Sequence, residues 1–261
     1  MSQHEQRVAL VSGATSGIGL AVARLLASRN HKVFIGARNA DNVAATVKQL
    51  QDEGLDVDGT TLDVRSRESV HAFVATAVDR FGTVDVLVNN AGRSGGGVTA
   101  DIDDELWNDV IDTNLNSVFR LTREVLTTGG LREKSRGRII NIASTAGKQG
   151  VVLGAPYSAS KHGVVGFTKA LGNELAPTGI TVNAVCPGYV ETPMAQRVRA
   201  GYAAAYDTSE DIILDKFQSK IPLGRYSTPE EVAGLVGYLA SDTAASITAQ
   251  ALNVCGGLGN F

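Results

Sequence analysis

Residues Asn141 to Gly163 read NIASTAGKQGVVLGAPYSASKHG and carry the chain from the end of one strand into a helix. The apolar run stops at small residues around Ser144, and Pro156 then opens the helix, because proline fits the first turn, where its missing N–H costs nothing. Tyr157 and Lys161 are four residues apart, so they share one helix face. The pattern predicts a hydroxyl at a strand tip near a phenol and an ammonium group.

These three side chains suit proton transfer. A phenol has a reference pKa of about 10, which is too high for ready proton exchange at neutral pH. A nearby cation favours the phenolate and lowers that pKa. Ser144, Tyr157 and Lys161 are therefore a candidate acid/base site for a carbonyl and its alcohol. A tyrosine and a lysine at this spacing are more often an ordinary surface pair, so the interpretation depends on the rest of the chain.

The composition is that of an ordinary globular domain. The 261 residues are enough for a large core and are near the upper limit for one domain, so we expect a single domain over 1–261. Hydrophobic residues make up 43% and charged residues 20%, as in soluble proteins. The net charge of −3 gives no overall basic field, so we expect no nucleic-acid partner.

No segment indicates export, a membrane span or a metal site. The N-terminal residues lack a basic region followed by a long apolar run, so no signal peptide is expected. No apolar stretch is long enough to cross a membrane. Cys186 and Cys255 form no C-x-x-C pair, which favours the reducing cytoplasm with both thiols buried. The four histidines lack ligand spacing.

A glycine loop follows the first predicted strand, Arg7 to Ser12. Gly13-Ala14-Thr15-Ser16-Gly17-Ile18-Gly19 leads from this strand into an amphipathic helix. Glycines let the backbone approach a diphosphate closely, and the helix N-terminus offers free N–H groups and a positive dipole end. Such a loop alone is a weak signal, since it can be a mere tight turn. Its place between strand and helix favours dinucleotide binding.

The residue after the second predicted strand, Lys32 to Ala37, indicates which dinucleotide binds. An acidic side chain here would bind the ribose 2′-OH of NAD, whereas an arginine accommodates the 2′-phosphate of NADP. Arg38 stands at this point, and neither Gly36 nor Ala37 is acidic. We therefore expect NADPH as the cofactor, although a solvent-facing loop arginine is the simpler alternative.

Other predicted strands also end in candidate cofactor residues. Asp63 follows a strand over 56–62 and is placed near the adenine. Asn89 and Asn90 end a strand over 85–88; adjacent asparagines hold turns, so we expect Asn89 to be structural and Asn90 to contact the cofactor. The candidate cofactor-binding residues are Gly13, Thr15, Ser16, Gly17, Ile18, Gly19, Arg38, Asp63, Val64, Asn90, Gly92, Tyr157, Lys161, Pro187, Gly188, Val190 and Thr192.

The alternation of strands and helices predicts an α/β fold. We expect a Rossmann-like central parallel sheet of about seven strands with helices on both faces. Ligands then bind at the carboxyl ends of the strands, where the candidate residues above gather. Residues 103–126 read as one long helix with Asn114 near its middle. Because asparagine is a poor interior helix residue, Asn114 is either exposed or bends the helix near the site.

The substrate is expected beside Ser144, under a lid of short helices over about 193–225. Tyr202 and Tyr206 in this lid either stack on the substrate or pack the lid's own core, and the sequence leaves both open. The candidate substrate residues are Ser94, Gly95, Gly96, Ser144, Gln149, Val151 and Tyr202.

Over nearly its whole length the chain resembles the short-chain dehydrogenase/reductase family. The matching elements are Ser12 to Gly19, Asn89-Asn90-Ala91-Gly92, Asn114, Ser144, Tyr157-Ser158-Ala159-Ser160-Lys161 and Pro187-Gly188. The resemblance implies a homotetramer and a catalytic set of Asn114, Ser144, Tyr157 and Lys161. In that set Lys161 contacts the cofactor ribose and Asn114 holds a water that passes protons.

Within the family the chain most resembles the ketoreductases of aromatic (type II) polyketide synthases. This rests on the stretches 91–97, 148–151 and 251–261. These relatives often carry Pro-Gly-Gly where this chain has Ser94-Gly95-Gly96, in a loop associated with substrate orientation, so the handedness of the product stays open.

The resemblance implies an NADPH-dependent ketoreductase of antibiotic biosynthesis. Its substrate would be a poly-β-ketone on an acyl carrier protein, for which Arg38, Arg65 and Arg93 form a possible basic docking patch. The alternative is that these arginines are scattered solvated charges or serve only NADP. A 3-oxoacyl-[acyl-carrier-protein] reductase of fatty-acid synthesis is the nearest rival function. A non-catalytic NADP sensor is a rival from another class.

Overall fold

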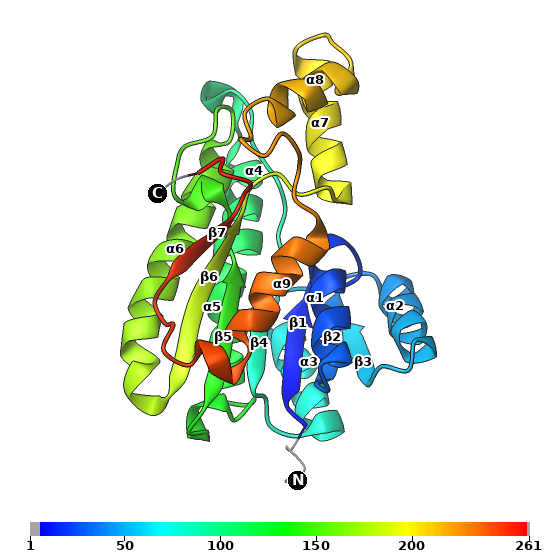
Figure 1. The fold of residues 1–261 in the computed structure, drawn as a ribbon, viewed down its shortest axis with the longest axis vertical. Coiled ribbons are helices and arrows are strands. Elements are labelled where there is room, and N and C mark those ends of the chain that lie inside the picture. The colour runs from blue at the N-terminus through cyan, green and yellow to red at the C-terminus, as the bar shows by residue number, and fades with distance from the viewer. Residues whose placement is uncertain (1–5, 260–261) are drawn as a thin grey trace.

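The computed structural model of the chain describes residues 6–259 (Figure 1). Its centre is a seven-stranded sheet in the order β3-β2-β1-β4-β5-β6-β7, and every neighbouring pair is parallel. The strands are β1 (Val8–Ser12), β2 (Lys32–Ala37), β3 (Val57–Thr61), β4 (Val86–Asn89), β5 (Gly137–Ile142), β6 (Ile180–Pro187) and β7 (Ala251–Val254). The predicted Rossmann-like sheet is thereby confirmed.

Helices cover both faces of the sheet (Figure 1). The α-helices are α1 (Gly17–Ser28), α2 (Ala40–Asp52), α3 (Arg67–Phe81), α4 (Asp104–Ile111), α5 (Ser117–Leu126), α6 (Ala155–Leu175), α7 (Pro193–Ala205), α8 (Glu210–Gln218) and α9 (Pro229–Leu239). Residues of α1, α2 and α9 share one core cluster, and residues of α3, α5 and α6 form the clusters on the other face. Because both faces are covered, central strands such as β1 and β4 are fully buried and mostly apolar.

Short 3-10 turns complete the chain. They are η1 (Thr99–Asp101), η3 (Leu131–Glu133), η4 (Thr145–Gly147), η5 (Ala176–Thr178) and η6 (Asp242–Ala244). Among residues 6–259, no helix is both long and apolar enough to cross a membrane.

The long helix predicted over 103–126 is interrupted. Between α4 and α5 the backbone forms a π-helix, η2 (Asp112–Asn116), and Asn114 lies inside it with only 1% of its surface exposed. The alternative that Asn114 is simply exposed is therefore wrong. Single π-helical turns inside α-helices often lie at functional sites.

Helices α7 and α8 project from the carboxyl-end edge of the sheet, at the top of Figure 1. They share a small core of their own, in which Ala203, Ile213, Phe217, Ile221 and Tyr226 are buried. The expected short helices in this region are thus present, and they are separate from the main core.

Candidate active site

Ser144, Tyr157 and Lys161 meet at the carboxyl end of β5. Ser144 begins η4 just after β5, and its hydroxyl is hydrogen-bonded to the Tyr157 phenol. The Lys161 ammonium lies 5.7 Å from the centroid of the Tyr157 ring. It donates a 2.8 Å hydrogen bond to the Ile142 carbonyl at the end of β5. The structure therefore brings the three predicted groups together.

The phenol of Tyr157 is poised as a proton donor. Burial raises its pKa above the ordinary value of 10.0, and the hydrogen bond from Ser144 offsets that rise only in part. The expectation of a lowered pKa for Tyr157 is therefore wrong, because desolvation of the buried phenol is the largest effect. A raised pKa keeps the hydroxyl protonated near neutral pH, which is the form needed to give a proton to a ketone oxygen.

Burial acts in the opposite sense on Lys161. Only 5% of this residue is exposed, and desolvation lowers the pKa of its ammonium from 10.5 to about 8. An amine with this pKa is roughly nine-tenths protonated at pH 7. Lys161 therefore carries a charge near neutrality and loses it in mildly alkaline solution.

Asn114 ties the loop after β4 to helix α6. Its Oδ1 accepts from the Arg93 backbone N–H at 2.8 Å, and its Nδ2 donates to the Arg93 carbonyl at 3.0 Å and to the Ser160 hydroxyl at 3.1 Å. Ser160 in turn donates to the Tyr157 carbonyl at 2.7 Å. Both amide hydrogens of Asn114 are thus in use, and the side chain links the catalytic helix to the substrate loop.

The glycine loop after β1 leaves no room for side chains. A Cβ at Gly13 would lie 2.8 Å from the Ala91 Cα, and one at Gly19 would lie 2.3 Å from the Gly13 carbonyl oxygen. Gly17 has a φ of +54°, a conformation that favours glycine. These close approaches keep the backbone bare at the start of α1.

The N-terminus of α1 is open to an anion. Its N-cap, Ser16, makes no side-chain capping bond, and the first turn holds no acidic residue. Helices α2, α3, α4, α7, α8 and α9 each have a side-chain cap. Free N–H groups and the helix dipole at this point fit a diphosphate. Thr15 and Ile18 flank the same turn.

The two asparagines after β4 hold the framework. Asn89 is buried and donates to Thr122 at 3.0 Å and to Asn141 at 2.8 Å, so its predicted structural role is confirmed. Asn90 donates from Nδ2 to the carbonyls of Ser12 at 3.0 Å and Gly13 at 2.9 Å. Its side chain therefore supports the glycine loop, and its contact with the cofactor stays a prediction.

At the adenine end of the predicted cofactor site, two of the candidate residues already contact other parts of the protein. Arg38 is exposed just past β2, as a 2′-phosphate ligand would be. Asp63 is bonded to Arg65 at 3.0 Å, and this guanidinium lowers the pKa of the carboxyl. Val64 is 6% exposed and packs in the core, so only its backbone faces the sheet edge.

Gly92 and the segment after β6 complete the sheet edge. A Cβ at Gly92 would lie 3.2 Å from Asn114 Oδ1 and 3.7 Å from Lys161 Nζ. Pro187, Gly188 and Val190 follow at the end of β6. Next to them, Thr192 caps α7, and its methyl carbon would lie 3.1 Å from a Cβ at Gly17. The glycine loop and this segment therefore meet at the sheet edge, on the two sides of the expected cofactor groove.

The predicted substrate loop is clamped between neighbours. A Cβ at Gly95 would lie 2.3 Å from a methyl of Val110, and one at Gly96 would lie 1.9 Å from the Leu153 carbonyl oxygen. Gly97 donates to that same oxygen at 2.8 Å. The loop that carries Ser94 therefore rests on the loop that carries Gln149 and Val151.

Tyr202 packs largely within the lid. Its ring meets Phe217 edge-on at 5.2 Å and lies 5.9 Å from the Tyr206 ring. Its hydroxyl donates to the Val152 carbonyl at 2.9 Å. These contacts favour the lid-core alternative for Tyr202, whereas Tyr206 is half exposed.

The three arginines of the predicted patch gather at the mouth of the site. Arg65 and Arg93 both pair with Asp109, the former at 2.9 Å. Arg38 is close enough to Asp63 to contribute to its lowered pKa. The three arginines therefore lie close together, and Asp63 and Asp109 partly neutralise them; a docking role stays a prediction.

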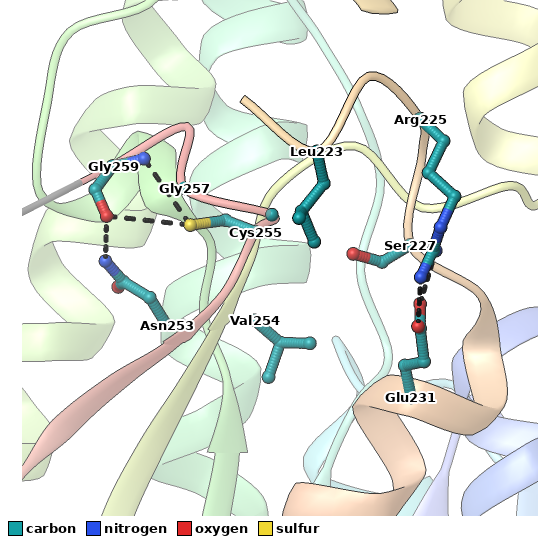
Figure 2. A pocket seen from close by; sticks show the side chains of 10 residues that line it. Leu223, Arg225, Ser227, Glu231, Asn253, Val254, Cys255, Gly257 and Gly259 are labelled. Atoms are coloured by element: carbon teal, nitrogen blue, oxygen red, sulfur yellow. Dashed lines mark hydrogen bonds and ion pairs between the residues drawn. The ribbon is translucent and has the colours of Figure 1, made fainter. Parts of the chain in front are cut away.

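A cavity of about 430 Å³ lies elsewhere, between the end of β7 and the segment before α9 (Figure 2). Leu223, Ser227, Val254 and Cys255 are among its lining residues, and none of the four predicted catalytic residues is. We therefore do not place the reaction there. Within residues 6–259 no group of three or more His, Cys, Asp or Glu side chains is arranged to hold a metal.

Sequence reasoning missed several residues that shape the site. Leu153 has a φ of +59°, rare for leucine, and its carbonyl anchors the substrate loop. Arg199 binds Glu191 and is 8% exposed. Neither residue carries a local signal, whereas Ser160 lies inside the quoted Tyr157–Lys161 motif and was open to notice.

Residues 7–203 match the family model described as short chain dehydrogenase. The chain belongs to the short-chain dehydrogenase family. A Streptomyces virginiae protein named as a monensin polyketide synthase ketoacyl reductase is 80% identical over 261 residues, covering the whole of both chains. A Streptomyces violaceoruber protein named as a granaticin polyketide synthase ketoacyl reductase is 65% identical over 97% of this chain and 93% of its own length. A crystal structure of an actinorhodin polyketide ketoreductase variant with NADPH is 59% identical and superimposes with a TM-score of 0.97, covering 100% of both chains.

Proposed function

We propose that this chain is an NADPH-dependent ketoreductase of aromatic polyketide antibiotic biosynthesis, reducing one ketone of a poly-β-ketone. The observation that carries the proposal is the meeting of Asn114, Ser144, Tyr157 and Lys161 beside a glycine-lined groove at one sheet edge. Relatives named as polyketide ketoreductases, one of them solved with NADPH, support it.

The groove fits the cofactor. The bare glycine loop and the uncapped start of α1 would hold the diphosphate, and Arg38 would hold the 2′-phosphate. Gly92, Asn90 and the segment 187–192 would enclose the rest of the molecule. Bound NADPH supplies a hydride to the carbonyl carbon of the substrate.

The protein supplies the proton and the charge stabilisation. As negative charge develops on the ketone oxygen, Tyr157 breaks its O–H bond and gives the proton to that oxygen, completing the alcohol. Ser144 donates a hydrogen bond to the same oxygen. The Lys161 ammonium stabilises the phenolate left on Tyr157, which must then be reprotonated from solvent.

Asn114 has a defined part in this scheme. Its side chain is committed to Arg93 and Ser160, so it fixes the distance between the substrate loop and the catalytic helix. The proton relay through water that the family implies would therefore depend on the main chain of η2 rather than on the amide hydrogens of Asn114.

Removing the phenol oxygen tests the assignment. Tyr157→Phe should lower turnover by roughly 10²- to 10⁴-fold, the usual contribution of general acid catalysis, while NADPH binding is largely kept. Nicotinamide absorbance is followed with a fused bicyclic ketone, and cofactor fluorescence gives the NADPH affinity. A variant with near-normal turnover would sink the assignment.

The substrate is proposed to arrive on an acyl carrier protein. Support comes from the clustering of Arg65 and Arg93 on Asp109 at the mouth, close to Arg38. Charge reversal at Arg65 and Arg93 should weaken use of a carrier-bound substrate and spare a small free ketone. Equal losses on both substrates would argue against docking.

Two rival functions are less well supported. A reductase of fatty-acid synthesis would prefer a linear acetoacetyl thioester to the bicyclic ketone, and comparing the two substrates decides between them. A sensor that only binds NADP has no need of the complete arrangement around Tyr157, and it would bind NADPH without oxidising it.

The chain is also proposed to form a homotetramer in the reducing cytoplasm. Phe119 on α5 is 47% exposed beside Phe167 of α6, and Trp107 on α4 is 42% exposed, as apolar residues covered by another copy would be. Both cysteines are free thiols. Light scattering on the eluted protein measures the assembly, and a monomeric mass would refute it.

A further inference from the structure

Arg199 is a buried arginine of helix α7 that plays no part in the chemistry described above. Only 8% of the residue is exposed. Its Nη1 lies 2.8 Å from Glu191 Oε2, and its Nη2 lies 2.9 Å from Glu191 Oε1. This two-pronged geometry is the strong form of an arginine–carboxylate pair and sets the orientation of both groups.

Glu191 lies within the segment 187–192, the wall of the groove opposite the glycine loop. Its backbone N–H donates to the Ser227 carbonyl at 3.0 Å, and the Ser227 N–H donates to the Tyr189 carbonyl at 2.9 Å. The Arg199 guanidinium carbon lies 5.5 Å from the centroid of the neighbouring Tyr226 ring. Arg199 therefore contacts both Glu191 and Tyr226, which lie on the two segments that these backbone hydrogen bonds join.

The contact reaches the cofactor groove through the next residue along the chain. Thr192 follows Glu191, caps α7 by accepting from the Ala195 N–H at 3.2 Å, and packs against the Gly17 position of the glycine loop. A shift of Glu191 would move Thr192 with it. The spacing between Thr192 and Gly17 thus depends on the Arg199–Glu191 pair.

Helix α7 has two attachments of unequal strength. Arg199, at its midpoint, holds the cofactor wall with two charge-assisted bonds. Tyr202, nearer its end, holds the substrate side with one neutral bond to Val152. Neutral hydrogen bonds contribute less than bonds between charged groups. When the lid moves, the Tyr202 contact should break first and α7 should stay with the cofactor wall.

We propose that Arg199 is a positioning residue that holds the cofactor wall in place through Glu191, so that the substrate lid sets NADPH affinity without touching the cofactor. The inference rests on the proposed function, because it takes 187–192 as the wall that binds NADPH. It adds to that function a physical link between the lid and the cofactor groove.

The test replaces the guanidinium with an uncharged chain of similar length. Arg199→Met should raise the Kd for NADPH roughly tenfold, since the guanidinium fork that orients the half-exposed Glu191 carboxylate is lost from an ordered wall. The turnover number at saturating NADPH should change far less. The Kd of Arg199→Lys, which keeps the charge but not the fork, should lie between the Kd of the wild type and that of Arg199→Met.

Arg7→Met is the matched control. Arg7 also binds both oxygens of a carboxylate, since its Nη2 donates to Asp242 Oδ1 and Oδ2 at 2.6 and 2.7 Å, and its side chain is 17% exposed against 10% for Arg199. It precedes β1, at the amino-terminal end of the sheet and away from the groove. Arg7→Met should lower the melting temperature and leave the Kd for NADPH unchanged.

A double variant separates positioning from general weakening. If Arg199 acts through Glu191, Arg199→Met combined with Glu191→Gln should bind NADPH no worse than Arg199→Met alone. The wild type is first shown to oxidise NADPH with the bicyclic ketone. The inference, but not the proposed function, is then overturned by an unchanged Kd in Arg199→Met or by an equal loss of NADPH affinity in Arg7→Met. Additive losses of affinity in the double variant would overturn it as well. A wild type that does not bind NADPH would overturn the proposed function as well.

Discussion

Replacing Gly96 with alanine probes the tightest contact of the substrate loop. The added Cβ would lie 1.9 Å from the Leu153 carbonyl oxygen and 3.0 Å from its carbon. Carbon and oxygen that are not bonded stay at least about 3.3 Å apart, so the two loops must separate by more than 1 Å. Leu153 is a poor candidate for that movement, because its φ of +59° confines it to a small allowed region.

The loss of stability in Gly96→Ala follows from the contacts that break when the two loops separate. The 2.8 Å bond from Gly97 to Leu153 is lost, worth about 1 kcal/mol, and the strained packing adds about 1–3 kcal/mol. For a chain of this size each kcal/mol lowers Tm by about 2–4 °C, so Gly96→Ala should melt several degrees lower. Because we propose that this loop faces the substrate, the handedness of the product alcohol should also shift, while NADPH affinity stays normal.

The assay combines thermal unfolding with chiral analysis of the alcohol made from a prochiral bicyclic ketone. Gly150→Ala is the control, since a Cβ at Gly150 meets nothing within 4 Å and the residue lies in the facing loop. If Gly96→Ala melts normally with an unchanged product ratio, or if Gly150→Ala produces the same shift, the steric reasoning is refuted.

Three further predictions concern charge and hydrogen bonding. Burial lowers the pKa of Lys161 to about 8, so the affinity for NADPH should weaken as pH rises through that value. Lys161→Met should bind NADPH weakly, and its affinity should not change over the same pH range. Arg225 and the Thr228 N–H lower the pKa of Glu231 from 4.5 to about 2; its stabilising contribution is therefore full above pH 4.5 and is lost as pH falls toward 2. The Tm gap between wild type and Glu231→Gln should narrow over that range, and a gap that widens in acid would contradict the assignment. Asn114→Ala removes one buried hydrogen bond to Ser160 and two part-buried bonds to the Arg93 backbone, and it should cost about 2–4 kcal/mol in urea unfolding. A loss near zero would mean that these bonds contribute little.

The core of the fold could be predicted from the sequence because the patterns that indicate it span only a few neighbouring residues. The runs at β1, β2 and β7 are short, apolar and bounded by loops, and the strand over 32–37 was placed at its observed bounds. The start of α9 has an equally local signal, because Thr228 and Glu231 are three residues apart and form a full capping box in the structure. Strand and helix alternation then leaves few topologies other than a parallel sheet.

The position of the site was predictable for the same reason. In a parallel sheet the carboxyl ends of all strands share one edge, so residues that follow strands, such as Ser144 and Asn90, must gather there. The geometry within the site was not predictable. The raised pKa of Tyr157 depends on how much protein surrounds the phenol, and no sequence spacing reports that.

The sequence by itself determined the sheet, the glycine loop and the acid/base pair of Tyr157 and Lys161, because each depends on neighbours within a few residues. Only the tertiary structure decided the π-helical turn at Asn114, the clamp of Leu153 on Gly96 and the fork of Arg199 on Glu191. These features join loops and helices that meet only after folding, and burial and steric fit between such segments have no period or motif in the chain.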